Sequence, residues 1–399
     1  MSTLDGRYRW LRSAVGPRLH FAGRGDAASE QPERTRLAGR ASDRGLVAVA
    51  TDREPLALER GEVMRHAEIA YQVFGPADAE RTVLVCHALT GDAHVTQRSG
   101  TGFGQERPGW WESLIGPGRA IDTRSVHVIA SNVLGGCSGS TGPASVDPAT
   151  GERYGAAFPD VTVGDWVEAQ RRLLDRLGVQ GPIDVIGGSV GGFQALEWAI
   201  RYPERVRSAI VLASGARLNA YGLAFNAVGR SAIEGDPRFR GGWYPESDPP
   251  AAGLALARQI GHLTYRTSGS FDWRFGREVD GETGAFSVER YLDHKGAHFV
   301  RRFDANSYLR MLGAMDAYDA AGGRGSLDAA LSRVRARMLL VGFSSDWLFP
   351  PGQSLELWHA AREVGVDAHA RVVETEEGHD AFLLPSEELS GAVGEFLAG

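Results

Sequence analysis

The feature that most constrains this chain is a glycine-rich turn between a short apolar run and a helix-forming segment. Residues 187–192 read Gly-Gly-Ser-Val-Gly-Gly, which contains the pattern G-x-S-x-G around Ser189. A β-branched run, residues 183–186, precedes the turn, and strong helix formers follow it. Such a strand-to-helix turn is so tight that small residues must flank the serine, whose hydroxyl is held clear of the sheet. The sequence therefore predicts a nucleophile elbow.

Size and composition narrow the class of protein. At 399 residues the chain can form one α/β domain with a large insertion. A net charge of -7 gives no electrostatic footprint for nucleic acid or for an anionic membrane surface. The longest apolar runs, such as residues 209–213 and 338–343, are far too short to span a bilayer. We expect a protein without nucleic-acid or membrane partners.

The reactive side chains outside the elbow are few. Cys86 and Cys137 are the only cysteines and do not form a C-x-x-C pair. This usage fits a reducing cytoplasm better than a disulfide framework. Neither H-E-x-x-H nor a Cys/His cluster with metal-ligand spacing is present, so we expect no metal site. Lys295 is the single lysine among 43 basic residues, which removes most candidates for a Schiff-base amine.

The chain divides by pattern into an extension, a core and an insertion. Residues 1–50 are rich in Arg, Gly, Ala and Ser without a regular period, which predicts a flexible Arg-rich extension. A transit peptide is the alternative, but acidic residues interrupt its pattern. Residues 51–215 and 326–399 form the predicted core. Residues 216–325 contain helical stretches but no comparable apolar strand, which predicts a mostly helical lid over the carboxyl ends of the strands.

Within the core, apolar runs alternate with helical periodicity. A hairpin is expected over residues 55–74, and apolar residues recur at helical spacing over residues 163–177. Continuous apolar runs suit strands buried on both faces of a parallel sheet. These runs lie within residues 81–89, 126–134, 183–186, 209–213 and 338–343. The predicted fold class is α/β: a mostly parallel central sheet flanked by helices, as in the α/β-hydrolase fold, with active residues at the carboxyl ends of the strands.

A serine nucleophile requires a base and an orienting acid. A structural serine or a phosphate-binding turn is the alternative for Ser189, but the chain has no G-x-x-x-x-G-K-[ST] motif. In α/β-hydrolase architecture the chain order is serine, acid, histidine. Asp346 follows the apolar run 338–343, and His379 follows a second run and a turn ending in Gly378. A helix cap is the alternative for Asp346, and a surface histidine for His379.

Two backbone N–H groups must face the oxyanion that develops during acyl transfer. The elbow architecture places one on the residue after the nucleophile, Val190, and the other in the loop after the strand at residues 83–86. In that loop, Leu89 is the best candidate. Ser189, Asp346 and His379 are therefore the predicted catalytic residues, with Leu89 and Val190 as the predicted oxyanion hole.

With these residues in place, the chain resembles the homoserine O-acetyltransferase family of α/β-hydrolase-fold enzymes. The resemblance extends over about residues 55–399, in order. The motifs that carry it are His-Ala-Leu-Thr-Gly-Asp at 87–92, Gly-Trp-Trp at 109–111, Ser-Asn-Val-Leu-Gly-Gly-Cys at 131–137 with Ser-Thr-Gly-Pro at 140–143, the elbow at 187–192, Ser-Asp-Trp-Leu-Phe-Pro-Pro at 345–351 and Gly-His-Asp-Ala-Phe-Leu at 378–383. Many members have methionine where this chain has Val190, a difference that affects the shape of the acyl pocket.

The resemblance implies that Ser189 attacks the thioester of acetyl-CoA and that L-homoserine then takes the acetyl group, with no bound cofactor. It also implies substrate binding by Arg258, Tyr265 and Asp380. An arginine suits an amino-acid carboxylate, and a buried aspartate suits an ammonium group. Arg258 pairing with an acid of the lid, and Tyr265 merely packing, are the alternatives. A homodimer with the lid helices at its interface is a further implication.

Other functions remain open at this point. Succinyl transfer to homoserine and acyl transfer to serine differ from the main hypothesis by pocket shape, and one methylene contributes only about 1 to 3 kcal/mol of discrimination. A serine esterase would use the same triad with water as the acceptor. A non-catalytic protein that keeps the fold is disfavoured because all three triad positions are filled.

Overall fold

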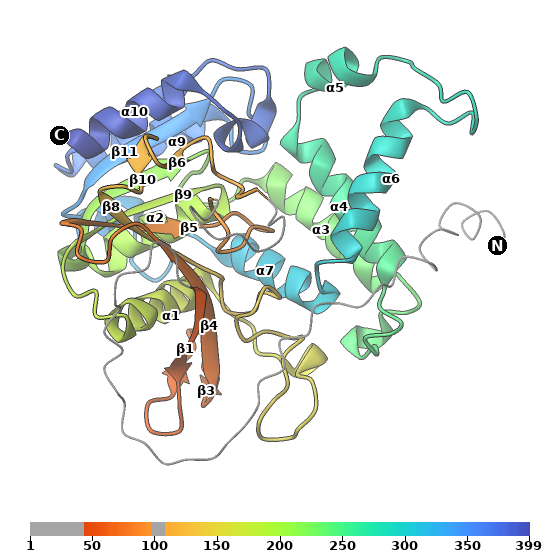
Figure 1. Cartoon of the computed structure of the whole chain (residues 1–399), viewed down its shortest axis with the longest axis horizontal. Coiled ribbons are helices and arrows are strands. Elements are labelled where there is room, and N and C mark those ends of the chain that lie inside the picture. Colours follow the sequence, from red (N-terminus) through yellow and green to blue (C-terminus); the bar gives the residue numbers. More distant parts are fainter. Residues whose placement is uncertain (1–43, 97–107) are drawn as a thin grey trace.

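The computed structural model describes residues 44–96 and 108–399. An eight-stranded sheet in the order β1-β4-β8-β5-β9-β10-β11-β12 forms the centre of this part of the chain (Figure 1). β2 and β3 pair separately, as do β6 and β7. The strands are β1 (Arg44–Ala50), β2 (Leu56–Ala57), β3 (Val63–Met64), β4 (Ala67–Phe74), β5 (Arg81–Cys86), β6 (Ile115–Gly116), β7 (Ile121–Asp122), β8 (Val126–Ser131), β9 (Ile183–Gly188), β10 (Val206–Leu212), β11 (Arg337–Phe343) and β12 (Ala368–Val373).

Most of the large sheet is parallel. Each pair from β8 to β12 runs parallel, whereas β4 pairs antiparallel with β8 and β1 antiparallel with β4. Every residue of β9 is buried, because helices cover both faces of the sheet. The α/β class and the mainly parallel sheet predicted from the alternating apolar runs are confirmed.

The helices are α1 (Val163–Arg176), α2 (Val190–Arg201), α3 (Ala220–Glu234), α4 (Ala251–Tyr265), α5 (Ser268–Phe275), α6 (Ser287–Val300), α7 (Ala305–Ala317), α8 (Leu327–Leu331), α9 (Pro351–Glu363) and α10 (Glu387–Ala398). α1, α2 and α9 contribute to the apolar cluster on one face of the sheet, and α10 to the cluster on the other. α1 begins where the sequence predicts, because the Thr162 hydroxyl and the Asp165 side chain form a capping box.

Two expectations for the amino-terminal part of the core need correction. Residues 1–43 of the expected extension lie outside the described residues, but its last seven residues form β1. Leu46 and Ala48 are exposed although they are apolar, so the sequence does not alternate between apolar and polar residues. Val47 and Val49 nevertheless face the core, and pairing with β4 stabilises the strand. The hairpin expected over residues 55–74 is only partly right. β2 pairs with β3 over two residues each, whereas β4 pairs with β1 and β8.

The section between β10 and β11 contains α3 to α8. We refer to residues 216–325, which hold α3 to α7, as the helical insertion. Figure 1 shows α3, α4, α5 and α6 grouped beside the sheet rather than against its two faces. α4 packs against α3, against α6 and against the 3₁₀ helix at Gly378–Leu383, which follows β12. Among the helices of residues 44–96 and 108–399, none combines the length and apolarity needed to cross a membrane.

Candidate active site

Ser189 occupies the turn between β9 and α2 in a backbone conformation that is rare for a residue with a side chain. Its φ and ψ are 59° and -127°, and such sparsely populated regions cost about 1–3 kcal/mol. Hydrogen bonds hold the turn in place. The Ser189 N–H donates to the Leu212 carbonyl at 2.9 Å, and the Ser214 hydroxyl donates to the Ser189 carbonyl at 2.9 Å. The turn therefore has the strained geometry that a nucleophile elbow requires.

Close backbone contacts explain the glycines on either side of Ser189. A Cβ atom at Gly187 would lie 2.2 Å from the Gly191 carbonyl oxygen. A Cβ atom at Gly191 would lie 2.3 Å from the Cys86 carbonyl oxygen at the end of β5. No side chain fits at these separations, so the G-x-S-x-G pattern reflects the close approach of β9, α2 and β5.

His379 and Asp346 form a buried pair at the carboxyl end of the sheet. The Asp346 carboxylate, just past β11, lies 2.7 Å from His379 Nδ1 through its Oδ2 atom. Its other oxygen accepts the backbone N–H groups of Leu348 at 3.0 Å and Phe349 at 2.9 Å. The His379 ring also stacks on the Phe349 ring, with centroids 5.3 Å apart. These contacts fix the orientation of the imidazole and leave its Nε2 atom for a third group.

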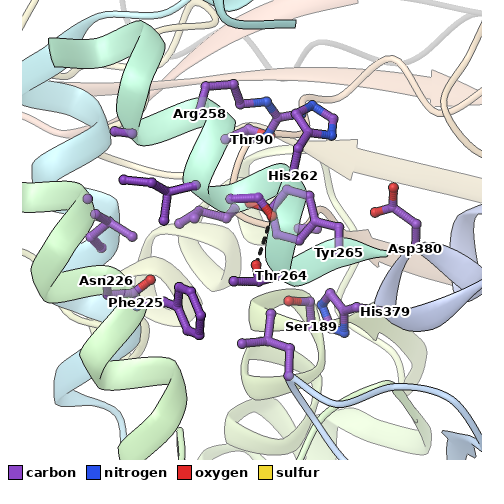
Figure 2. Close-up of a pocket in the computed structure, with 18 of the residues that line it drawn as sticks. Thr90, Ser189, Phe225, Asn226, Arg258, His262, Thr264, Tyr265, His379 and Asp380 are labelled. Atoms are coloured by element: carbon purple, nitrogen blue, oxygen red, sulfur yellow. Dashed lines mark hydrogen bonds between the residues drawn. The ribbon is translucent and has the colours of Figure 1, made fainter. Parts of the chain in front are cut away.

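Ser189 and His379 line the same cavity, which has a volume of about 260 Å³ (Figure 2). In the described part of the chain, no hydrogen bond joins their side chains. Hydrogen bonds between catalytic groups are often long without substrate and tighten in the complex. The missing hydrogen bond is therefore compatible with a pair in which His379 activates Ser189. The cavity also receives Asp380 from the 3₁₀ helix, Arg258 and Tyr265 from α4, and apolar side chains from α3 and α7.

The loop after β5 lies against the elbow. Leu89 lines the cavity, and Val190 is the first residue of α2. In residues 44–96 and 108–399, neither backbone N–H group has a hydrogen-bond partner. His87 fixes the loop, because its Nδ1 lies 2.7 Å from the Ala88 carbonyl and its Nε2 accepts the Val133 N–H at 3.2 Å. Burial lowers the pKa of His87, consistent with a neutral ring bonded at both nitrogens.

Arg258 extends from α4 along the wall of the cavity. Its Nη1 donates to the Thr90 hydroxyl at 3.2 Å, and its guanidinium lies over the rings of Tyr265 and Phe299, 5.4 and 5.0 Å from their centroids. Among the described residues no carboxylate lies within ion-pair distance of Arg258. Arg258 therefore does not form the ion pair with an acid of the insertion that was the alternative. The guanidinium is available for a ligand carboxylate.

Asp380 has a protein partner that sequence reasoning missed. Its Oδ2 lies 3.4 Å from Arg266 Nε, and Arg266 also contacts Glu377 at 2.5 Å. Burial raises the pKa of the Asp380 carboxyl, whereas Arg266 and His379 lower it. Arg266 directly follows α4, so only the packing of α4 on the 3₁₀ helix brings it to Asp380. No local pattern marks such a contact.

Six of the eight predicted site residues line one cavity, whereas Val190 follows Ser189 in the chain and Asp346 contacts His379. The structure also adds neighbours that the sequence did not single out. His87 holds the loop after β5, Thr90 binds Arg258, and Arg266 pairs with Asp380. His87 and Thr90 belong to the motif at 87–92, so their position next to Leu89 was a usable signal. Within the described residues, no group of three or more His, Cys, Asp or Glu side chains has the arrangement of a metal site.

Comparisons with known proteins agree with this fold. A family model described as alpha/beta hydrolase fold matches residues 81–385. A homoserine O-acetyltransferase of Solidesulfovibrio magneticus is 45% identical over 374 residues, which cover 90% of this chain and 93% of that protein. At this identity and coverage, the two chains share a family.

Solved structures include both transferases and esterases. A homoserine O-acetyltransferase from Bacillus anthracis superposes with a TM-score of 0.83 at 26% identity, covering 90% of this chain and 99% of that one. The crystal structure of an esterase superposes with a TM-score of 0.81 at 25% identity, covering 89% of this chain and 100% of that one. Structures named as homoserine O-acetyltransferases and as esterases therefore share this architecture.

Proposed function

The chain belongs to the homoserine O-acetyltransferase family of α/β-hydrolase-fold proteins, and from this premise we propose its reaction and the roles of its residues. It moves an acetyl group from acetyl-CoA to the side-chain hydroxyl of L-homoserine, a step of methionine biosynthesis. The relationship of 45% identity over 90% of the chain carries this conclusion. The buried pair of His379 and Asp346 beside the strained Ser189 supports the mechanism.

In the first half-reaction, His379 Nε2 takes the proton of the Ser189 hydroxyl as the serine oxygen attacks the thioester carbon. The backbone N–H groups of Leu89 and Val190 stabilise the oxyanion of the tetrahedral intermediate. The carbon–sulfur bond then breaks, the thiolate of CoA receives the proton from His379, and acetyl-Ser189 remains. Asp346 keeps the imidazole in the correct tautomer and stabilises its charged form.

In the second half-reaction, the homoserine hydroxyl gives its proton to His379 and attacks acetyl-Ser189. A second tetrahedral intermediate collapses, the proton returns to the Ser189 oxygen, and O-acetyl-L-homoserine leaves. Arg258 binds the substrate carboxylate, Asp380 binds its ammonium group, and Tyr265 packs beside Arg258. The acyl group is carried by Ser189, so this scheme requires acetyl-CoA as a co-substrate and no bound cofactor.

We further propose that the helical insertion acts as a lid and forms the interface of a homodimer. Apolar side chains on α3 and α4 are exposed, including Tyr221 and Val228 at 59% and 55% and Leu256 and Leu263 at 40% and 45%. Such side chains favour association with a second copy. A cytoplasmic location fits the two free thiols. Sedimentation equilibrium of the wild type and of Val228→Asp tests the dimer, because a charge at this position should dissociate it.

A specificity matrix tests the activity. The purified protein is mixed with acetyl-CoA or succinyl-CoA and with L-homoserine, L-serine or water as acceptor, and CoA release is measured. We expect acetyl-CoA with homoserine to be the fastest combination. Transfer mainly from succinyl-CoA, or mainly to serine, would assign a neighbouring activity of the family. Release of CoA or hydrolysis of an aryl acetate that homoserine does not accelerate would favour the esterase activity of the structural neighbour.

A further inference from the structure

A second cavity, of about 200 Å³, lies beside the first and is formed by α5, α6 and the segments next to them. The first cavity holds Ser189, whereas none of the residues assigned to catalysis above lines the second. The aromatic and arginine side chains that line the second cavity are Arg266, Phe271, Trp273, Arg274, Phe275 and Tyr291. Its lining is thus aromatic and cationic.

The two cavities share a wall. Asp380 lines the first cavity, and its ion-pair partner Arg266 lines the second. Likewise, His262 lines the first cavity, and its Nδ1 lies 3.4 Å from the hydroxyl of Tyr291 in the second. The two cavities are therefore adjacent, separated by these paired side chains.

Aromatic rings in the second cavity present flat surfaces to a ligand. The rings of Phe275 and Tyr291 have centroids 4.9 Å apart, and the Phe271 ring lies 6.2 Å from that of Tyr291. Trp273 is 89% exposed, the highest exposure among the large hydrophobic residues of the described chain. Planar bases stack on aromatic rings of this kind. A purine is a ligand of suitable shape and chemistry.

Two cations at this wall lack carboxylate partners. In the described residues, neither Arg274 nor Lys295 has an acidic group within ion-pair distance. Their charged groups lie over the Tyr291 ring, 5.1 and 5.5 Å from its centroid. By contrast, the neighbouring arginines Arg266 and Arg290 are paired with Glu377 and Asp280.

The neighbouring positive charges affect the pKa of Lys295. Burial lowers the pKa of its amine, and the charges of Arg258 and Arg274 lower it further. Among the described residues, the acids that line the two cavities, Glu377 and Asp380, are each paired with Arg266. Unneutralised cations at a cavity are typical of sites for phosphate groups.

We propose that the second cavity binds the adenosine 3′,5′-bisphosphate end of the acyl-CoA donor. The adenine ring stacks on the aromatic rings around Tyr291, Arg274 and Lys295 contact the phosphate groups, and the pantetheine arm passes the shared wall to Ser189. Glu377, the acid that lines this cavity, is neutralised by Arg266. The inference rests on the proposed function, because it assumes that the donor is an acyl-CoA.

The test compares two acetyl donors in the wild type and in Arg274→Ala. Acetyl-CoA carries the nucleotide, whereas S-acetyl-N-acetylcysteamine has the same thioester without it. We expect Arg274→Ala to raise the KM for acetyl-CoA roughly 10-fold or more at nearly unchanged kcat. The ratio of kcat/KM for acetyl-CoA to kcat/KM for the short donor should fall by a similar factor, and Arg274→Lys should restore part of it. Arg277→Ala is the matched control, because Arg277 lies over Phe286 and lines neither cavity.

Each result has a defined meaning. An unchanged KM for acetyl-CoA in both Arg274→Ala and Lys295→Gln overturns the inference. An equal loss of kcat/KM with both donors also overturns it, because it indicates a general disturbance of the insertion. If the wild type transfers acetyl groups from neither donor, the proposed function fails and the inference fails with it. Wild-type transfer from the short donor keeps these two failures distinguishable.

Discussion

In the sheet, buried charged side chains are paired, whereas the helical insertion holds cations without carboxylate partners beside the cavities. Asp184 in β9 lies 3.2 Å from Arg81 of β5, and Asp346 lies 2.7 Å from His379. In the described part of the insertion, Arg258, Arg274 and Lys295 have no such partner. The difference suggests a division of labour: the sheet orients the groups that transfer the acyl group, and the insertion supplies the charges that select the substrates.

The largest expected effect tests the sheet side of this comparison. Ser189→Ala should lower kcat by about 10⁴-fold or more, because the members of a triad act as a unit. Steady-state kinetics with acetyl-CoA and homoserine measure the loss, and circular dichroism checks the fold. Acetylation of the protein by acetyl-CoA, followed by mass spectrometry, should vanish as well. A variant that retains substantial transfer would remove Ser189 as the nucleophile.

The next effect tests the insertion side. Arg258→Ala should lower kcat/KM for homoserine by about 10- to 100-fold, since a hydrogen bond to a charged group contributes about 1.5–3 kcal/mol. Formation of acetyl-Ser189 from acetyl-CoA should stay near the wild-type rate. Rapid-quench measurement of the two half-reactions separates these outcomes. Equal loss in both half-reactions contradicts the assignment of Arg258 to the homoserine carboxylate.

A pair of glycine substitutions compares packing in the two regions. Gly191→Ala places a Cβ atom 2.3 Å from the Cys86 carbonyl oxygen, and overpacking of this kind costs about 1–3 kcal/mol or more. Gly313 lies within α7, where an added Cβ atom would meet nothing within 4 Å apart from the adjoining backbone of its own helix. Gly313→Ala should therefore stabilise the fold by about 0.5–1 kcal/mol. Thermal unfolding of both variants measures the two shifts, and a destabilised Gly313→Ala would contradict this description of the insertion.

The smallest effect concerns pH. Burial raises the pKa of Asp380, so its carboxylate is lost at a higher pH than that of an ordinary aspartate. On acidification, the KM for homoserine should rise as Asp380 becomes protonated and no longer attracts the ammonium group. Asp380→Asn should show a high KM without this dependence. The pH profile of acetyl-CoA consumption in the first half-reaction is the control, because it does not involve the ammonium group. A parallel pH dependence of KM in the wild type and Asp380→Asn would contradict the assignment.

Much of the site could be predicted because its signals are local. The elbow around Ser189 is a single tight turn, and Asp346 and His379 each follow a strand, so chain order and strand ends are sufficient to find them. β1 was missed because its apolar residues do not alternate and its stability comes from pairing with β4. The contact of Arg266 with Asp380 was missed because it joins segments more than a hundred residues apart. Contacts made only by tertiary packing leave no local pattern.

The single lysine has a practical consequence for experiments on this protein. Lys295 lines the first cavity, is half-buried and has a lowered pKa, and its amine lies over the Tyr291 ring of the second cavity. The chain has no other side-chain amine. An amine-selective fluorophore applied near neutral pH should therefore attach at this position and at the α-amino group alone. Protection of Lys295 from this label by acetyl-CoA would report on the arrival of the donor without any engineered residue.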